Sequence, residues 1–422
     1  MKYTNTIVSS SIGNVLEWYD FGLFTIFSAL FGRLFFPVYD QKAGMIATFG
    51  VFAVGFLCRP IGALIFGYLG DRTGRAKTLR LSILMITLPT LLIGFLPTYD
   101  QIGIFAPTLL IIIRMLQGIS IGGEYSGNLI YLAETAPTQY RAAITACASM
   151  GSNIGILLAA IVGIITTTLF TPVTLDDWGW RIPYVLSGLL GLFIYYYRLN
   201  LKETSVFKYL RAENLLTQNP IKTVFKYNLP QLLRTLGLVC MGTTFYYFCF
   251  IFLPLYLRQQ FTLSIRHISI LMSCLILLMI ILIPLAGLLC DKFGRKKMLV
   301  FNATFIFLII VPGFYLLNFS SSILIIFTLV IFTFASSLEQ GTTSVAIVEN
   351  FPPPARYTGV SFGYNLGNGL LGGTVPFISE WLFFKTNLLI APALYIAICA
   401  GITLLVSLFF VKETKGINLT TE

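Results

Sequence analysis

The chain has 422 residues, of which 56% are hydrophobic and only 11% are charged. A water-soluble domain carries roughly 25% charged residues, so this composition excludes a soluble globular enzyme and an intrinsically disordered chain. The net charge of +11 would suit a nucleic-acid partner, but the distribution of the basic residues argues against one.

Long apolar segments follow one another along the whole chain. A helix needs about 20 apolar residues to cross the hydrocarbon core of a bilayer. The alternating strands of roughly 10 residues that build an outer-membrane barrel are missing. The sequence therefore predicts an all-α membrane protein with twelve transmembrane helices, near residues 8–32, 44–69, 78–96, 104–133, 142–170, 182–199, 231–257, 267–290, 298–318, 321–348, 357–383 and 387–411.

The basic residues predict the orientation of these helices. If both termini are cytoplasmic, twenty of the 28 Lys and Arg residues fall in cytoplasmic segments and six in outer segments. The positive-inside rule favours this orientation, so the excess charge faces anionic lipid and no nucleic-acid partner is expected. The N-terminal segment lacks a signal-peptide cleavage pattern. The seven Cys lie in apolar spans without a C-x-x-C motif, so neither a disulfide nor a metal site is expected.

Three sequence matches recur in the same order and indicate a doubled unit. They are GYLGDRTGRAK at 67–77 with GLLCDKFGRKK at 287–297, AETAPTQYR at 133–141 with VENFPPPAR at 348–356, and LKET at 201–204 with VKET at 411–414. An even number of spans separates the copies, so the two halves are parallel. We expect a pseudo-symmetric pair of six-helix bundles at 1–199 and 231–422, joined by a polar cytoplasmic linker at 200–230. Parallel halves with a site at their interface are a transporter architecture.

These motifs resemble those of the major facilitator superfamily over nearly the whole chain. The D-x-x-G-R-x-K loops resemble its most widespread motif, and RMLQG at 114–118 resembles its motif in the fourth helix. A narrower similarity is to the metabolite:proton symporters, which include bacterial importers of proline/betaine, shikimate, 2-oxoglutarate and citrate. It is carried by GNVLEWYDFGLF at 13–24, FLCRPIGALIFGYLGDRTGR at 56–75, IGGEYSG at 121–127 and DWGWRIPY at 177–184.

Charged residues inside the predicted spans are the main functional candidates, because an ionised side chain there costs at least about 2.5–3.5 kcal/mol. The acids are Glu17, Asp20, Glu124 and Glu339, and the bases are Arg59 and Arg114. Helical spacing places three polar stripes at similar depth: Glu17 with Asp20, Gly55 with Arg59 and Gly62, and Arg114 with Gln117, Ile121 and Glu124. We expect these stripes to line one water-accessible cavity in the N-terminal half.

The buried charges suit proton coupling and carboxylate recognition. A carboxyl near an arginine can exchange between a proton-bound and an Arg-paired state. The LKET and VKET repeats also resemble those of the related sugar porters. That resemblance implies that Asp20 is the proton carrier and pairs with Arg114; Glu17 and Glu124 are the second candidates. Arg59 and Arg114, with Gln117 beside them, are the candidates for binding a substrate carboxylate, since guanidinium groups bind carboxylates in a planar, bidentate way. The alternative is that both arginines only neutralise Asp20 and Glu124 in fixed pairs.

The second half offers fewer candidates. Glu339 is its only deeply placed charge and either faces a cavity or makes a local polar contact. The family resemblance places Asn153, Asn365 and Tyr246 at the cavity, where aromatic rings could face a quaternary ammonium, although ordinary packing explains them equally well. The only histidine, His267, is expected at the surface, so proton coupling would run on carboxylates.

The repeated loop motifs suggest a gate at the cytoplasmic ends of the helices. Asp71 and Asp291 can bind arginines or helix N-termini, Gly74 and Gly294 permit tight turns, and Arg75 and Arg295 lie at headgroup level. We also expect the pairs Glu134–Arg141 and Glu349–Arg356. Breaking these contacts would favour the inward-open state. The alternative is that the basic residues serve only as topology signals.

Together these observations predict a proton-coupled symporter of the bacterial inner membrane that imports a small carboxylate-bearing metabolite by alternating access. It would act as a monomer without a cofactor other than the transported proton. The alternatives are an antiporter that exports organic cations or drugs, and a non-transporting membrane sensor. No His cluster, nucleophile motif or metal-ligand spacing supports an enzyme.

Overall fold

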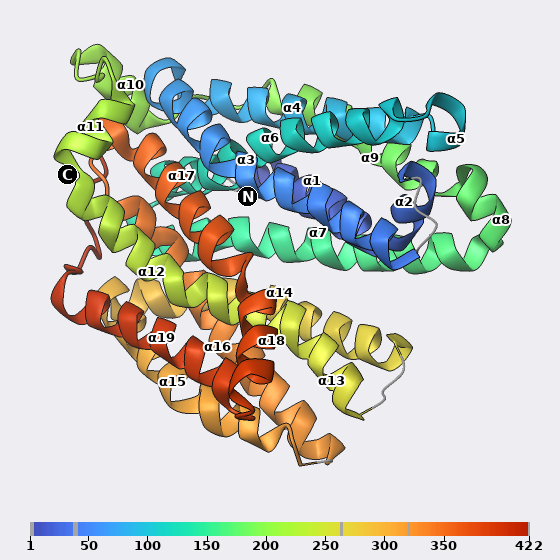
Figure 1. Cartoon of the computed structure of the whole chain (residues 1–422). Helices are drawn as coiled ribbons and strands as arrows, with labels where there is room; N and C mark the ends of the chain where they lie inside the picture. The colour runs from blue at the N-terminus through green and yellow to red at the C-terminus, as the bar shows by residue number, and fades with distance from the viewer. Residues whose placement is uncertain (1–3, 37–40, 262–264, 320, 421–422) are drawn as a thin grey trace.

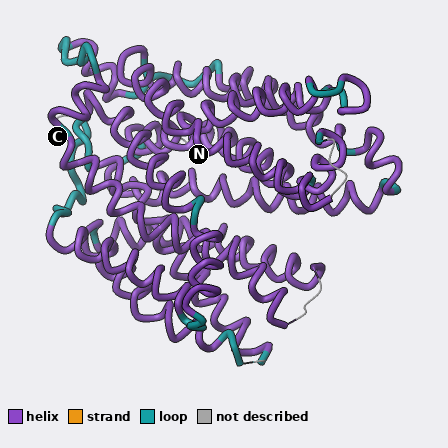
Figure 2. The backbone as a smooth tube through the Cα atoms, viewed as in Figure 1, coloured by secondary structure: helices purple, strands orange, loops and turns teal. Residues whose placement is uncertain are grey.

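The computed structural model describes residues 4–36, 41–261, 265–319 and 321–420, and all regular structure in these ranges is helical. The basic charges predict that both termini are cytoplasmic, but the terminal residues themselves lie outside these ranges. The long apolar segments form helices because no polar backbone group can stay unpaired in hydrocarbon. Figure 2 shows that short loops join almost continuous helices.

The N-terminal half runs from α1 to α9. Its long helices are α1 (Thr4–Ile26), α2 (Ser28–Phe35), α3 (Gln41–Thr73), α4 (Arg75–Phe95), α6 (Phe105–Thr135), α7 (Arg141–Leu169) and α9 (Arg181–Arg198). Short helical turns connect them: α5 (Tyr99–Ile102), η1 (Thr138–Tyr140), α8 (Pro172–Thr174) and η2 (Leu175–Gly179). The first predicted span is bent by 66° between α1 and α2, which the hydrophobic pattern did not predict.

The C-terminal half follows the linker helices α10 (Ser205–Ala212) and α11 (Pro220–Tyr227). Its elements are α12 (Leu229–Tyr247), η3 (Phe248–Phe252), α13 (Leu253–Phe261), α14 (Ile265–Phe293), α15 (Arg295–Leu316), α16 (Ser322–Glu349), η4 (Pro353–Ala355), α17 (Arg356–Gly367), η5 (Asn368–Gly372), α18 (Val375–Thr386) and α19 (Ala391–Phe409). Helix covers each of the twelve predicted spans. In the described part of the chain, nine helices are long and apolar enough to cross a membrane alone, or ten with the bent pair α1–α2.

The two halves meet at one end of the molecule and diverge at the other (Figure 1). We call the end that carries α10 and α11 the linker side, and the opposite end the far side. Helix α7 packs along α14, and α3 packs along α17; α6 and α16 also contact helices of the other half, so each half contributes at least three helices to the interface. An apolar cluster on the linker side joins both halves, the linker and the C-terminal segment through Leu129, Val206, Val348 and Leu419. On the far side each half keeps a separate core.

Candidate functional site

Asp20 and Arg114 form a buried ion pair inside the N-terminal half. Arg114 Nη1 on α6 lies 2.9 Å from Asp20 Oδ2 on α1, and Thr90 donates a hydrogen bond of 3.1 Å to Asp20 Oδ1. Gln117 donates to Thr90 Oγ1 at 2.8 Å, which extends this chain of hydrogen bonds along α6. The Arg114 guanidinium lies 3.6 Å above the centre of the Phe24 ring. Its Nε and Nη2 atoms have no hydrogen-bond partner among the described residues, so the pairing is incomplete.

Glu124 occupies a different environment at the linker side of the same half. Arg198, at the end of α9, binds its two carboxylate oxygens at 2.6 and 3.0 Å, and Ser82 donates a further hydrogen bond of 2.6 Å. Arg198 also donates to the backbone carbonyls of residues 9, 10 and 79. All donors of this guanidinium are therefore used, which is the arrangement expected of a structural ion pair. Arg198 lies at the end of the predicted span 182–199, and no sequence pattern identified it as the partner of Glu124.

Arg59 lies on α3 among aromatic rings. Its Cζ atom is 3.9 Å from the centre of the Phe56 ring, 5.4 Å from that of Phe21 and 6.0 Å from that of Trp18. The side chain is almost fully buried, and it takes part in none of the ion pairs formed by the described residues. The charge of Arg59 is the strongest electrostatic attraction acting on Glu17. Glu17 Oε2 has no hydrogen-bond partner in the described part of the chain.

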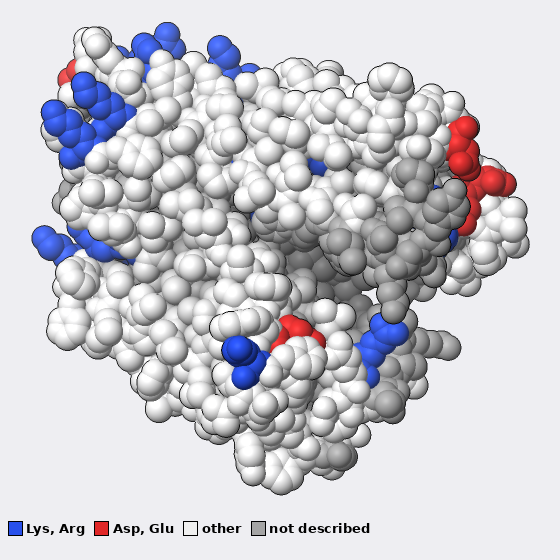
Figure 3. Space-filling model, in the orientation of Figure 1, with Lys and Arg blue, Asp and Glu red and all other residues white. Residues whose placement is uncertain are grey.

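A cavity lies between the two halves. Its walls carry aromatic rings and polar side chains, and Glu339 is the only charged residue among the described ones that line it. The lining residues are Trp18, Tyr125, Ser149, Ser152, Asn153, Val239, Gly242, Thr243, Tyr246, Tyr247, Glu339, Gln340, Thr343, Ser344, Ile347, Tyr364 and Asn368. Figure 3 shows the surface hollowed between the halves on the side away from α10.

The position of the cavity differs from the prediction of a cavity within the N-terminal half. Asp20, Glu17, Arg59, Arg114, Gln117 and Glu124 are not among its lining residues. The physical reason is that rings of α1 and α3 cover the two arginines, as Phe24 does for Arg114. Asn153, Tyr246 and Glu339 do line the cavity. Asn365 instead bonds across the interface, donating to the Gly122 carbonyl at 2.9 Å.

Hydrogen bonds between the halves close the cavity toward the linker side. The Ser149 and Ser344 hydroxyls lie 3.0 Å apart, and Asn153 donates to Gln340 Oε1 at 3.0 Å. Along α16 the cavity-lining positions end at Ile347, and Glu349 follows at the linker side. A cluster of ion pairs begins there.

This cluster, which we call the gate, consists of Asp71, Arg75, Glu134, Arg141, Asp291, Arg295, Glu349 and Arg356. The Asp71 carboxylate accepts hydrogen bonds from the backbone N–H groups of Tyr357 and Thr358 at 3.1 and 2.9 Å. The Asp291 carboxylate accepts from those of Ala142 and Ala143, both at 3.0 Å. Each aspartate thus caps the first turn of a helix of the other half, where the helix dipole favours negative charge.

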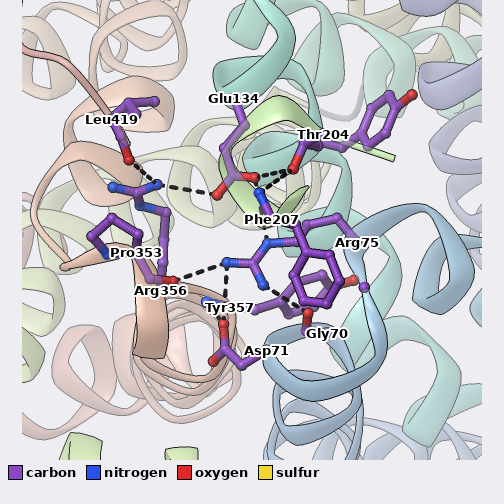
Figure 4. A network of polar contacts seen from close by, with 12 residues as sticks. Gly70, Asp71, Arg75, Glu134, Thr204, Phe207, Pro353, Arg356, Tyr357 and Leu419 are labelled. Atoms are coloured by element: carbon purple, nitrogen blue, oxygen red, sulfur yellow. Dashed lines mark hydrogen bonds and ion pairs between the residues drawn. The ribbon is translucent and has the colours of Figure 1, made fainter. Parts of the chain in front are cut away.

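The glutamates of the gate also cross between the halves. Arg356 Nη1 lies 3.1 Å from Glu134 Oε1, and Arg141 Nη1 lies 2.9 Å from Glu349 Oε1. The expected pairs Glu134–Arg141 and Glu349–Arg356 are therefore wrong, because each glutamate reaches the arginine of the other half. Figure 4 shows the first half of this network, in which Arg75 also donates to the Pro353 carbonyl across the interface at 2.9 Å.

The turns of the two repeats have the same construction. Gly74 and Gly294 have φ angles of +120° and +99°, which a residue with a Cβ atom rarely adopts. Glu203 accepts hydrogen bonds from the backbone N–H groups of Arg75 and Ala76, and Glu413 accepts from those of Arg295 and Lys296. The LKET and VKET repeats therefore supply the caps of α4 and α15. The LKET and VKET repeat is visible in the sequence, but the spacing of the two motifs does not reveal which backbone groups Glu203 and Glu413 bind.

The C-terminal segment crosses the gate on the linker side. Its backbone carbonyls accept hydrogen bonds from gate arginines of both halves: Arg141 donates to Ile417 at 3.1 Å, and Arg356 donates to Leu419 at 3.2 Å. The Leu419 side chain is buried in the apolar cluster that joins the halves. The segment therefore connects the two bundles.

Comparisons with known proteins agree with this architecture. The family profile of the Major Facilitator Superfamily matches residues 21–376. The chain is 34% identical over 426 residues to the glycine betaine/proline/ectoine/pipecolic acid transporter OusA of Dickeya dadantii, covering 98% of this chain and 84% of that protein. It is 33% identical over 424 residues to the proline/betaine transporter of Escherichia coli K12, with the same coverage. The proton:xylose symporter XylE bound to 6-bromo-6-deoxy-D-glucose shares the fold, with a TM-score of 0.79 at 16% identity over 99% of this chain and 97% of that chain.

Proposed function

The chain belongs to the major facilitator superfamily, and from that premise we propose that it imports a small zwitterion with a carboxylate, such as proline or betaine, together with protons. It is a secondary active transporter and not an enzyme. The names of its relatives in Dickeya dadantii and Escherichia coli support proline and betaine as the substrate class.

The observation that carries this proposal is the cavity between the halves. It lies at the interface of two parallel repeats, where transporters bind their substrates, and its wall combines aromatic rings, polar side chains and one carboxylate. The gate holds the halves together on the linker side only. A rocking motion that breaks the gate and closes the far side would expose the cavity alternately to the two sides.

Asp20 is the proposed proton carrier. Its ion pair with Arg114 consists of one hydrogen bond, and two nitrogens of the guanidinium are unpartnered. Protonation of Asp20 would remove the attraction and release Arg114. Because the described conformation buries both side chains, proton exchange at Asp20 requires the surrounding helices to move. Proton exchange and substrate transport would be coupled, because both would require the same movement of the helices.

The proposed location is the bacterial inner membrane, with both termini and the linker side in the cytoplasm and the protein acting as a monomer. The distribution of Lys and Arg supports this orientation. The gate would then be an inner gate. We also propose Glu17 and Glu124 as second candidates for proton coupling, and the gate residues for gating. The saturated contacts of Glu124 favour a structural role for that residue.

The test is uptake into proteoliposomes with an imposed pH gradient. With the outside more acidic, we expect labelled proline or betaine to accumulate inside, and a protonophore to abolish the accumulation. Citrate, shikimate and 2-oxoglutarate serve as competing substrates. An organic cation that leaves the vesicles in exchange for entering protons, without uptake of either zwitterion, would contradict the proposal and establish the antiport alternative.

A further inference from the structure

Most buried charges of the protein are neutralised by a specific partner. Arg114 pairs with Asp20, Arg198 with Glu124, and the gate residues with one another. Glu17, Arg59 and Glu339 are different, since none of them takes part in the ion pairs among the residues that the structure describes. Arg59 attracts Glu17 within the N-terminal half, whereas Glu339 is the only charged residue among the described ones that line the cavity. An uncompensated buried charge is costly, so a function that requires Glu339 is the natural explanation.

Glu339 presents its carboxylate to the cavity from the C-terminal half. It lies on α16 and contacts Gly242 of α12, where a larger side chain would overlap the carboxylate. Tyr246 and Tyr247 follow Gly242 by about one turn of α12 and line the same cavity. A carboxylate beside aromatic faces is a site for an alkylated ammonium group, because the ring quadrupole attracts the cation and the ring excludes water.

Arg59 lies behind the wall that the N-terminal half contributes to the same cavity. Its guanidinium is 6.0 Å from the Trp18 ring, and Trp18 lines the cavity. The cavity therefore lies between Glu339 of one half and the buried Arg59 of the other, which has Glu17 of its own half nearby.

We infer that Glu339 is the specificity-determining counter-ion for the ammonium group of a zwitterionic substrate, whose carboxylate points toward Arg59. This inference rests on the proposed function and adds the orientation of the substrate. A zwitterion in this orientation pairs its ammonium group with Glu339 of one half and directs its carboxylate toward the wall in front of Arg59 of the other half, and so links the two bundles. A carboxylate without an ammonium group can neutralise only Arg59 and leaves Glu339 uncompensated, so the site discriminates against simple organic acids.

The test compares betaine with 3,3-dimethylbutanoate, in which a carbon atom replaces the quaternary nitrogen while the shape and the carboxylate remain. Equilibrium binding to the purified protein gives the ratio of the two dissociation constants. We expect the wild type to bind betaine at least about tenfold more tightly, given the strength of cation–π and ionic contacts. In Glu339→Gln the ratio should fall toward one. Glu380→Gln, which removes a carboxylate on α18 outside the cavity, should keep the wild-type ratio.

A ratio measured within one preparation does not depend on the folded fraction, so partial unfolding cannot imitate the effect. Gly242→Ala is the second variant: the new methyl group would displace the Glu339 carboxylate without removing it, and the ratio should again fall. Retention of the wild-type ratio by either variant would overturn the inference. Absence of betaine and proline transport by the wild type would instead refute the proposed function.

Discussion

At the scale of single residues, the two ion pairs of the N-terminal half differ in how completely their groups are bonded. Arg198 uses every donor on Glu124 and on backbone carbonyls, whereas Arg114 makes one hydrogen bond to Asp20 and leaves two nitrogens unpartnered. A saturated buried pair stabilises one structure, because no other arrangement satisfies its groups equally well. An unsaturated pair can break at a lower cost and suits a group that changes its charge during transport.

This difference predicts opposite phenotypes for two similar substitutions. Asp20→Asn should abolish accumulation of substrate under a proton gradient while exchange of labelled substrate across the vesicle membrane continues. Glu124→Gln should lower the free energy of unfolding by about 3–5 kcal/mol, because Arg198 then keeps a buried charge without a counter-ion. The measurements are proteoliposome uptake with exchange, and thermal unfolding in detergent. Wild-type accumulation by Asp20→Asn, or unchanged stability of Glu124→Gln, would contradict this interpretation.

At the scale of elements, the turn between α3 and α4 and the turn between α14 and α15 are built alike. In each, a glycine with positive φ ends one helix, and a glutamate from a distant LKET or VKET motif caps the next. The glycine also makes room for that glutamate: a Cβ atom on Gly294 would overlap the Glu413 carboxylate. The turn and its cap therefore depend on each other.

Gly294→Ala should consequently destabilise the protein by more than about 1 kcal/mol, because the new methyl group strains the backbone and displaces the Glu413 cap. Thermal unfolding of the purified protein measures the effect. The matched control is Gly401→Ala on α19, where the added atom would make only ordinary contacts with Phe307 at 3.6 Å or more. Equal melting temperatures for the two variants would show that the turn geometry is not required.

Much of the fold and part of the site could be predicted from the sequence. Apolar length predicted the twelve spans, and the repeated motifs marked both turns and every member of the gate. The partner of each gate residue could not be predicted, since Glu134 has an arginine seven residues away and yet binds Arg356. Helical periodicity placed Arg59 and Arg114 on polar stripes, but it says nothing about the rings that cover them. The Glu124–Arg198 pair joins residues 74 positions apart, beyond the reach of any local pattern.

At the scale of the whole molecule, the gate holds the halves together through reciprocal contacts. Asp71 of the N-terminal half caps α17, and Asp291 of the C-terminal half caps α7. Both caps exist only while the linker side is closed. The equilibrium between the closed and open linker side therefore depends on two equivalent carboxylates.

Asp71→Asn and Asp291→Asn should each shift the population toward a conformation with an open linker side, and the double variant should shift it further. The readout is the distance between spin labels at Gln139 and Lys292, which are exposed on different halves, in a background without native cysteines. We expect a longer distance in both variants. Asp100→Asn, exposed on α5, is the control. An unchanged distance in the double variant would show that the caps do not hold the gate.

The path of the C-terminal segment has a practical consequence for engineering. Arg141 and Arg356 hold it by main-chain oxygens at positions 417 and 419, and almost any amino acid supplies such an oxygen. Point substitutions at positions that act only through their backbone, such as Ile417, should thus be tolerated. Glu413, Thr414 and Leu419 are exceptions, because their side chains cap α15, bind Glu349 and fill the apolar cluster, respectively. Deleting a residue upstream would shift both carbonyls out of register with two arginines at once. An affinity tag inserted before position 417 would wedge the bundles apart and bias any transport assay performed on the fusion.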